Sequence, residues 1–326
     1  MRSLGSFIVI VTLCILPFSA QALEMVYPAD KTVVLRSDFL IIKGGATPVL
    51  EAMIIEINGV ASDPVDISDE AYKTAFADFL IMEPEWSKGK NTITISGLVG
   101  GKSVTTLKAD IYYSPLADPL LLIPAGYKQF VMHTAANEAL CVPCHNMNPS
   151  AAQLRNPTAE DNPCGACHRR MFDKAFVHGP EGVFQCSDCH DSKKNWRVTK
   201  AEDVLCGECH TDKIDEFKNN SFVHGPVAVG SCTSCHDPHA SAEPAQLYAP
   251  INQLCSGCHS TVKEGDHVGR GTRKAGHPLS KVKDPLREGK QLSCVSCHNP
   301  HSGKSADLFI RNLSGRFSLC QECHKK

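Results

Sequence analysis

Cys232-Thr233-Ser234-Cys235-His236 is the stretch that decides the fold, because the chain repeats this Cys-x-x-Cys-His pattern eight times. The protein has 326 residues and 17 cysteines, and only Cys14 lies outside the motifs. Each motif places two thiols and one imidazole on a single tight turn. The motifs are Cys141-Cys144-His145, Cys164-Cys167-His168, Cys186-Cys189-His190, Cys206-Cys209-His210, Cys232-Cys235-His236, Cys255-Cys258-His259, Cys294-Cys297-His298 and Cys320-Cys323-His324.

This spacing is the attachment signature of c-type haem. Two thioether bonds join the cysteines to the porphyrin, and the adjacent imidazole ligates the iron from one face. We therefore expect eight covalently bound haem c groups, one for each motif. The proximal iron ligands are then His145, His168, His190, His210, His236, His259, His298 and His324.

Three other uses of paired cysteines are less consistent with the pattern. Four-thiolate zinc sites need no histidine after the second cysteine. A disulfide scaffold in an exported chain does not explain a histidine placed identically eight times. A thioredoxin-like redox motif needs alternating strands and helices, which the sequence around these cysteines does not predict.

The N-terminus predicts export. Arg2 precedes an apolar run from Phe7 to Phe18, and Ala20-Gln21-Ala22 supplies small residues for cleavage, so residues 1–22 read as a signal peptide. A lipid anchor on Cys14 is the alternative, but Leu13 stands where a small residue is wanted. We expect no transmembrane span in the mature chain and a location in the periplasm or at the cell surface of a bacterium.

Charge argues against nucleic-acid binding. Removing Arg2 with the leader lowers Lys and Arg from 33 to 32, against 35 Asp and Glu. The mature polypeptide is therefore close to neutral, and haem propionates would make it more acidic. It lacks the basic surface that nucleic-acid partners require.

Histidine and cysteine divide the chain into two regions. Residues 23–118 contain neither, whereas all 15 histidines lie between His133 and His324. Pro115, Pro119 and Pro124 punctuate the boundary, so we expect a β domain at 23–118, a linker at 119–132 and a haem domain at 133–326.

The first region predicts short strands. Segments rich in Val, Ile, Thr and aromatic residues alternate with glycine turns at Gly44-Gly45, Asn58-Gly59, Lys88-Gly89 and Gly100-Gly101. The stretch Trp86 to Tyr113 resembles the closing strands of bacterial immunoglobulin-like domains, which implies an all-β sandwich used as a spacer or docking module. The expected strands are Thr32–Ile42, Ala52–Asn58, Phe76–Ile81, Asn91–Ser96 and Ser103–Tyr113.

The haem region is an internal repeat. Consecutive motifs pair into repeats 1 to 4, whose first motifs begin at Cys141, Cys186, Cys232 and Cys294. A leading histidine precedes the first motif by eight residues in repeats 1 to 3 and by 17 in repeat 4. These leading histidines are His133, His178, His224 and His277.

The sequence here resembles the doubled-CxxCH family of multihaem cytochromes c. The resemblance is strongest where His224-Gly225-Pro226 leads to Cys232 and where a trailing histidine, His239 or His301, stands three residues after the motif histidine. Asn148 and Lys193 occupy that trailing position in repeats 1 and 2. The resemblance implies electron carriers with mostly six-coordinate iron. From His133 to His324 there are 192 residues, or 24 for each of eight haems, which is too few for an apolar core around each one. We therefore expect short helices and irregular segments wrapped around closely stacked haems that supply much of the core.

Seven histidines remain as candidate distal ligands for eight irons, so at least one iron needs a different sixth ligand. Met147 is a weak substitute, and a lysine such as Lys193 must lose its proton before it binds iron. His267 lies in a glycine-rich segment outside the repeat pattern, where a solvated loop is the alternative. The candidates are His133, His178, His224, His239, His267, His277 and His301.

We therefore expect an electron carrier rather than an enzyme, because no catalytic constellation stands out beyond the haems. Its partners would be redox proteins: other cytochromes, a quinol-oxidising complex or an outer-membrane conduit. Two alternatives remain at this point. One is an octahaem oxidoreductase that reduces a small nitrogen or sulfur oxyanion at an open haem, and the other is a filament-forming conductive cytochrome.

Overall fold

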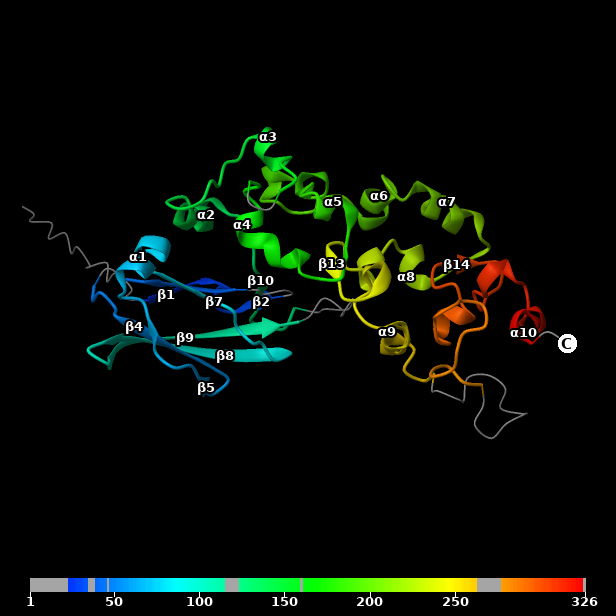
Figure 1. Cartoon of the computed structure of the whole chain (residues 1–326), viewed down its shortest axis with the longest axis horizontal. Coiled ribbons are helices and arrows are strands. Elements are labelled where there is room, and N and C mark those ends of the chain that lie inside the picture. The colour runs from blue at the N-terminus through cyan, green and yellow to red at the C-terminus, as the bar shows by residue number, and fades with distance from the viewer. Residues whose placement is uncertain are drawn as a thin grey trace, which may run out of the picture. The chain divides into compact units, whose positions relative to one another are not determined.

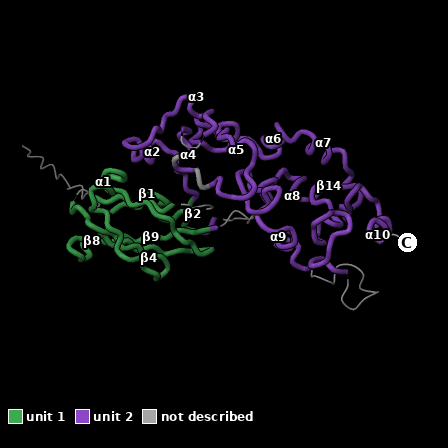
Figure 2. Tube along the Cα trace, viewed as in Figure 1, with its two compact units in different colours: residues 1–113, 125–128 green, residues 114–124, 129–326 purple. Residues whose placement is uncertain are grey.

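The computed structural model describes residues 23–34, 39–45, 47–114, 123–158, 161–262 and 277–324. The expected signal peptide, Cys14 and His267 lie outside these residues. The chain divides into two compact units, one of residues 1–113 and 125–128, the other of residues 114–124 and 129–326 (Figure 2). Within the described ranges, no helix is both long and apolar enough to cross a bilayer.

The first unit consists of two β-sheets and one helix (Figure 1). One sheet has the order β1-β3-β7, and the other runs β10-β2-β9-β8-β4-β5, with β6 also paired to β4. The strands are β1 (Leu23–Tyr27), β2 (Thr32–Val34), β3 (Leu40–Gly44), β4 (Ala52–Ile57), β5 (Val60–Ala61), β6 (Val65–Asp66), β7 (Phe79–Met82), β8 (Gly89–Val99), β9 (Lys102–Tyr113) and β10 (Lys128–Gln129).

The longest hairpin shows why these residues form strands. Gly100 and Gly101 both adopt positive φ, of 57° and 73°, which is the geometry of a tight two-residue turn. The turn sets β8 against β9 in antiparallel register from Gly89↔Tyr113 to Val99↔Lys102. Along β8 the side chains of Asn91, Ile93 and Ile95 are buried while Thr92 is exposed, as the alternating pattern predicts.

One expected strand begins later than the sequence indicated. Phe76 is the last residue of helix α1 (Glu70–Phe76), and the strand β7 starts only at Phe79. The helix begins there because the Asp69 carboxylate accepts hydrogen bonds from the backbone N–H groups of Ala71 and Tyr72, at 2.9 and 3.0 Å. Helix α1 was not among the elements expected from the sequence.

The second unit consists of short helices and turns (Figure 1), so a β-rich region is followed by a short-helix region as the sequence predicted. Its longest described helix, α7, has nine residues. The α-helices are α2 (Ala135–Cys141), α3 (Ala151–Leu154), α4 (Gly165–His168), α5 (Gly179–Gly182), α6 (Glu202–Gly207), α7 (Thr211–Asn219), α8 (Gly225–Ala228), α9 (Ile251–Cys258) and α10 (Arg316–Cys323). The 3-10 helices are η1 (Arg169–Phe172), η2 (Cys186–Asp188), η3 (Ser192–Lys194), η4 (Cys232–Ser234), η5 (Pro244–Gln246), η6 (Cys294–Ser296) and η7 (Ile310–Asn312).

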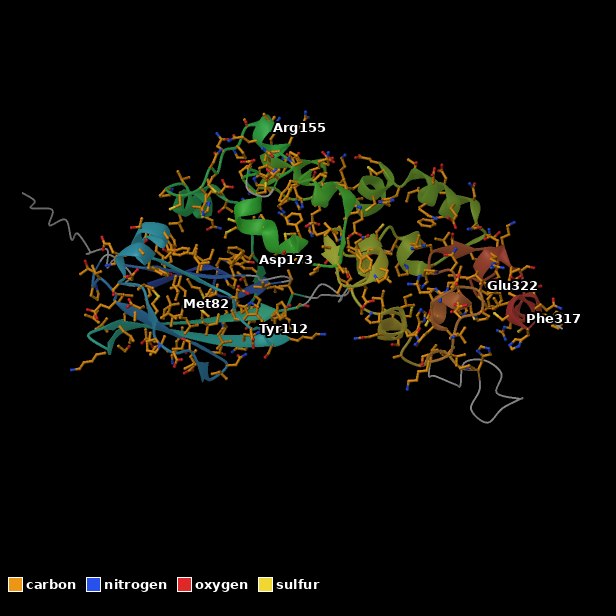
Figure 3. All side chains as sticks on the ribbon, viewed as in Figure 1. Met82, Tyr112, Arg155, Asp173, Phe317 and Glu322 are labelled. Carbon is orange, nitrogen blue, oxygen red and sulfur yellow. The ribbon has the colours of Figure 1, made fainter. Side chains whose placement is uncertain are left out.

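Apolar side chains alone do not build a core in this unit. Among the described residues, its buried hydrophobic side chains are Phe184, Ala240, Leu292 and Phe309, and the others all belong to the first unit. Phe317 of α10 is 76 % exposed and lies near the C-terminal end (Figure 3). So sparse an apolar interior agrees with the expectation that haems supply most of the core.

Two small antiparallel ladders join successive repeats. β11 (Phe176–Val177) pairs with β13 (Ala240–Ser241), and β12 (Phe222–Val223) pairs with β14 (Ser302–Gly303). In each ladder, the strand before a leading histidine pairs with the strand after the trailing histidine of the next repeat. The ladders therefore bring histidines of two different repeats together.

Candidate haem-binding site

All eight motifs share one local turn. In each, the backbone N–H of the histidine donates to the carbonyl of the first cysteine at 2.9 to 3.2 Å. This i to i+4 bond closes a single helical turn, which holds both thiols and the imidazole on one short segment. The geometry is the one required for one porphyrin edge to meet both cysteines.

The turns fall into two structural kinds. The first motifs of repeats 2, 3 and 4 begin on the 3-10 helices η2, η4 and η6. The second motifs lie on α-helices α4, α6, α9 and α10. The first motif of repeat 1 differs from the other first motifs, because Cys141 is the last residue of α2.

Backbone carbonyls orient three of the motif imidazoles. The Nδ1 atoms of His190, His236 and His298 lie 2.7, 2.7 and 2.6 Å from the carbonyl oxygens of Trp196, Ala245 and Asp307. A carbonyl only accepts, so the proton is on Nδ1 and Nε2 keeps its lone pair for a metal. The sequence did not indicate these carbonyl partners, because any residue type supplies one.

Six histidine pairs face each other with nearly constant spacing. Each pair joins a motif histidine to a leading or trailing histidine, and the ring centroids are 6.0 to 6.2 Å apart. The pairs are His133 with His168, His178 with His210, His239 with His190, His224 with His259, His301 with His236, and His277 with His324.

This spacing fits one iron between two imidazoles. A metal–nitrogen bond of about 2 Å, with about 1 Å more from nitrogen to ring centre on each side, sets two axial rings about 6 Å apart. Stacked aromatic rings in direct contact prefer offset or edge-on arrangements, whereas His190 and His239 are inclined by only 8° at 6.0 Å. The residues present therefore fit a haem iron held from both faces.

The pairs follow two rules that the sequence had left open. Each leading histidine faces the second motif histidine of its own repeat, as His224 faces His259. Each trailing histidine faces the first motif histidine of the preceding repeat, as His239 faces His190 and His301 faces His236. Repeats 3 and 4 thus each place a candidate ligand in the repeat before them.

The inter-repeat ladders hold these ligands in place. The backbone N–H of His178 donates to the carbonyl of His239 at 2.7 Å, and that of His224 donates to the carbonyl of His301 at 2.8 Å. The rings of His178 and His224 also bond the backbone carbonyls of Pro238 and Pro300. One ladder therefore positions the ligands for two neighbouring sites.

Burial keeps several of these imidazoles neutral. Desolvation lowers the pKa of His178, His224 and His301 below the usual value, and a neighbouring imidazole lowers each further. A neutral imidazole is the form that binds metal. The protonation state that the site favours is thus the one that ligation needs.

Cysteines of consecutive motifs also lie close together. Between repeats, the first thiols hydrogen-bond: Cys164 with Cys186, Cys206 with Cys232, and Cys255 with Cys294. Within a repeat, each second thiol has the other motif's thiol near enough to raise its pKa, after the larger effect of burial. Those pairs are Cys167 with Cys141, Cys189 with Cys209, Cys235 with Cys258, and Cys297 with Cys323. Each attachment site therefore adjoins the next in sequence order.

Not every candidate ligand falls into a pair. The His145 ring is exposed, and no described histidine ring faces it. Met147 is half-buried beside it. The His298 ring lies 5.8 Å from the ring of Phe309 and is not among the six pairs. Among the remaining histidines, His267 lies outside the described residues.

The doubled CXXCH motif family matches residues 224–264 and 284–326. These segments contain repeats 3 and 4, the two with a trailing histidine, and cover about a quarter of the chain. No curated protein matches the chain. The doubled motif, together with histidine rings spaced for iron, indicates a multihaem c-type cytochrome with covalently bound haem c.

Proposed function

We propose that this protein is an exported octahaem cytochrome c that carries electrons along a chain of closely spaced, mostly bis-histidine haems in anaerobic or extracellular respiration. The observation that supports this most is the adjacency of attachment sites, because each motif has a cysteine beside the next motif from Cys141 to Cys323. Adjacent attachment sites imply adjacent porphyrins, and short gaps favour electron transfer between them.

The haem, when bound, supplies reversible one-electron exchange between ferric and ferrous iron. At the six paired sites, two histidines would hold the iron, so that neither oxidation state would open a coordination position. The carbonyls of Trp196, Ala245 and Asp307 hold their imidazoles in one orientation and make them stronger ligands. Partial burial of His178 and His301 would help to set the potential of the haems that they ligate.

The proposed ligand set combines the sequence and the pairs. The two cysteines of each motif attach the haem, and the motif histidine is the proximal ligand. His133, His178, His224, His239, His277 and His301 are the distal ligands of six haems. His267 is proposed for one of the other two haems, and the last has no histidine, with Met147 only a weak candidate for its sixth ligand.

The domain organisation is part of the proposal. Residues 1–22 would be removed on export to the periplasm or cell surface. Residues 23–118 would form an immunoglobulin-like spacer or docking module, residues 119–132 a linker, and residues 133–326 the octahaem domain. The two packed sheets of the first unit support the sandwich interpretation. Redox proteins are the proposed partners.

Haem content and potential test the proposal. Protein matured in a host with a cytochrome c maturation system should give eight haems per polypeptide by the pyridine haemochrome assay. It should also take up eight electrons in a redox titration. A matched variant, Cys206→Ala with Cys209→Ala, should lose one haem and slow electron passage between dyes or electrodes at the two ends of the chain. Fewer than eight haems, or unchanged passage in the variant, would contradict the proposal.

One observation favours a second function, reduction of a small nitrogen or sulfur oxyanion. His145 is exposed and faces no described histidine, so its haem would have room for a substrate. Turnover of nitrite, hydroxylamine and tetrathionate with a reduced dye as donor discriminates the two functions. Rapid turnover would favour the reductase, and its absence would favour the electron carrier.

A further inference from the structure

A turn shared by all four repeats presents the trailing residue. In each repeat, the Asn or Asp after the first motif histidine accepts a hydrogen bond from the backbone N–H two residues later, at 2.8 to 3.1 Å. Such turns form wherever Asn or Asp precedes a bend. The residues so presented are Asn148, Lys193, His239 and His301 in repeats 1 to 4.

The pairing rule assigns each trailing residue to the preceding repeat. His301 of repeat 4 faces His236 of repeat 3, and His239 of repeat 3 faces His190 of repeat 2. By the same rule, the trailing residue of repeat 2 would face His145 of repeat 1. That residue is Lys193, whose ammonium group has three donors and no lone pair for a metal.

Repeat 2 also lacks the short strand that follows the trailing histidine in repeats 3 and 4. The carbonyl that orients the imidazole lies nine residues after His236 and His298 but only six after His190. The shorter loop has no room for the strand that follows the trailing histidine in repeats 3 and 4. Asn195 and Trp196 adopt positive φ, as Ala245 and Gln246 do in repeat 3. The chain of repeat 2 returns sooner, so that Asp191 bridges Arg197, whereas the bridges of repeats 3 and 4 join His236 to Leu247 and His298 to Phe309.

The shortened loop covers a different site. The Trp196 ring lies 6.2 Å from the ring of His133, inclined by 62°, and so packs against the histidine that faces His168. Trp196 thus lies beside the pair formed by His133 and His168, the second motif histidine of repeat 1. Within the described residues, the ring contacts bring no other ring to His145.

We propose that the haem attached through Cys141, Cys144 and His145 has an open sixth position, and that it binds small diatomic or triatomic ligands such as carbon monoxide and cyanide. This inference rests on the proposed octahaem function and assigns the open site to one haem. Lys193 stands at the place in the repeat where a closing histidine stands elsewhere. The three-residue shortening of its loop removes the docking strand as well.

The experiment titrates carbon monoxide into dithionite-reduced, fully matured protein and counts the ligand bound per chain from the Soret change. The variant Cys141→Ala with Cys144→Ala removes the haem in question, and Cys320→Ala with Cys323→Ala is a matched control at the last motif. His133→Ala is a positive control, because it should open one paired site. We expect tight binding in wild type, loss of that binding in the first variant, retention in the second, and one additional molecule in His133→Ala.

Two outcomes overturn the inference: no carbon monoxide binding in wild type, or binding that survives removal of Cys141 and Cys144. The haem count of the same samples separates this result from failure of the proposed function. Eight haems without ligand binding would refute only the open site. If the cysteine variant does not fold, a loop exchange replaces it. In that exchange, residues 237–246 replace residues 191–197 and so supply His239 and the strand that follows it. The exchange should abolish carbon monoxide binding. The same exchange with Asn in place of His239 should leave carbon monoxide binding intact.

Discussion

Asp284 is the centre of a buried hydrogen-bond network beside the motif Cys294-Cys297-His298. The substitution Asp284→Asn tests how much this network contributes to the free energy of unfolding. Its carboxylate side chain is fully buried. One oxygen, Oδ2, accepts from Arg287 Nε at 2.6 Å and from Ser296 Oγ at 2.7 Å, while Oδ1 accepts from the Leu286 N–H at 2.8 Å. Ser296 lies between the two cysteines of the motif, so the network bears directly on the attachment turn.

The cost of the substitution follows from which bonds survive. The amide oxygen of Asn keeps the bond from Leu286, but its NH2 group would face two donors where Oδ2 now accepts. Loss of a charge-assisted hydrogen bond and of the counter-ion of a partly buried arginine costs about 2 to 4 kcal/mol. Arg287 retains its bonds to the hydroxyls of Ser293 and Ser296, which limits the loss.

The same substitution has a defined pH dependence. Burial alone would raise the pKa of Asp284, but hydrogen bonds from Ser296 and Arg287 outweigh it and lower the pKa below its usual value. A carboxyl group with a lowered folded pKa stabilises the protein above its unfolded pKa, about 3.9, and loses that contribution as pH falls through the folded value. The difference between wild type and variant should therefore be constant near neutrality and shrink below about pH 4.

Guanidinium unfolding of the haem-loaded protein at several pH values measures this difference, and hydrogen exchange at residues 284–298 locates it. Asp307→Asn is the matched control, because Asp307 pairs with Arg316 at 3.6 Å on an exposed surface. Asp307→Asn should lower the free energy of unfolding by less than about 1 kcal/mol. Equal effects of the two substitutions, or a difference that persists unchanged at pH 2, would refute the reasoning.

Three further substitutions test other parts of the structure. His239→Ala should add one carbon monoxide site per chain, and that site should vanish with Cys186→Ala and Cys189→Ala but persist with Cys232→Ala and Cys235→Ala. Gly230→Ala should destabilise by about 1 to 3 kcal/mol in guanidinium unfolding, because φ is 72° and a Cβ would lie 2.9 Å from Asp203 Cβ. Gly289→Ala, at φ 71° with open space, should cost less. Asn91→Ala should lower the free energy of unfolding by about 2 to 4 kcal/mol and raise hydrogen exchange in β4 and β8. The reason is that the buried Asn91 side chain donates to the carbonyls of Ser87 and Gly89 and accepts from the Ser87 N–H and the Asn58 side chain.

Local patterns predicted part of the β-rich region, but the expected strand Thr32–Ile42 is two strands, β2 and β3, that belong to different sheets. Two glycines with positive φ and strict alternation along residues 91–95 leave one arrangement for the hairpin of β8 and β9. Helix α1 was not among the expected elements, although Asp69 caps it and Glu70, Ala71, Lys73 and Ala75 favour helix. Capping and propensity agree there, and Phe76 was assigned to the apolar strand that follows.

The ligand pairing was beyond the sequence for a different reason. His239 stands three residues after His236, yet its ring faces His190, which is 49 residues away in the chain. The turn at Asp237 and the ladder from β11 to β13 redirect it. Repeat spacing identified which histidines belong to the pattern. The direction in which each trailing histidine points depends both on the Asp or Asn turn and on ladder hydrogen bonds to a distant segment, which local sequence does not specify.

The inter-repeat ladders have a consequence for how such a chain matures. In the proposed ligand set, the first iron of repeat 2 would take a ligand from repeat 3, and that of repeat 3 would take one from repeat 4. If the chain is exported from its N-terminus, as proposed, each of these repeats would wait for its successor to emerge before its coordination was complete. A premature stop codon before His301 would thus also deprive that iron of repeat 3 of its distal ligand, so the loss of one repeat would impair two.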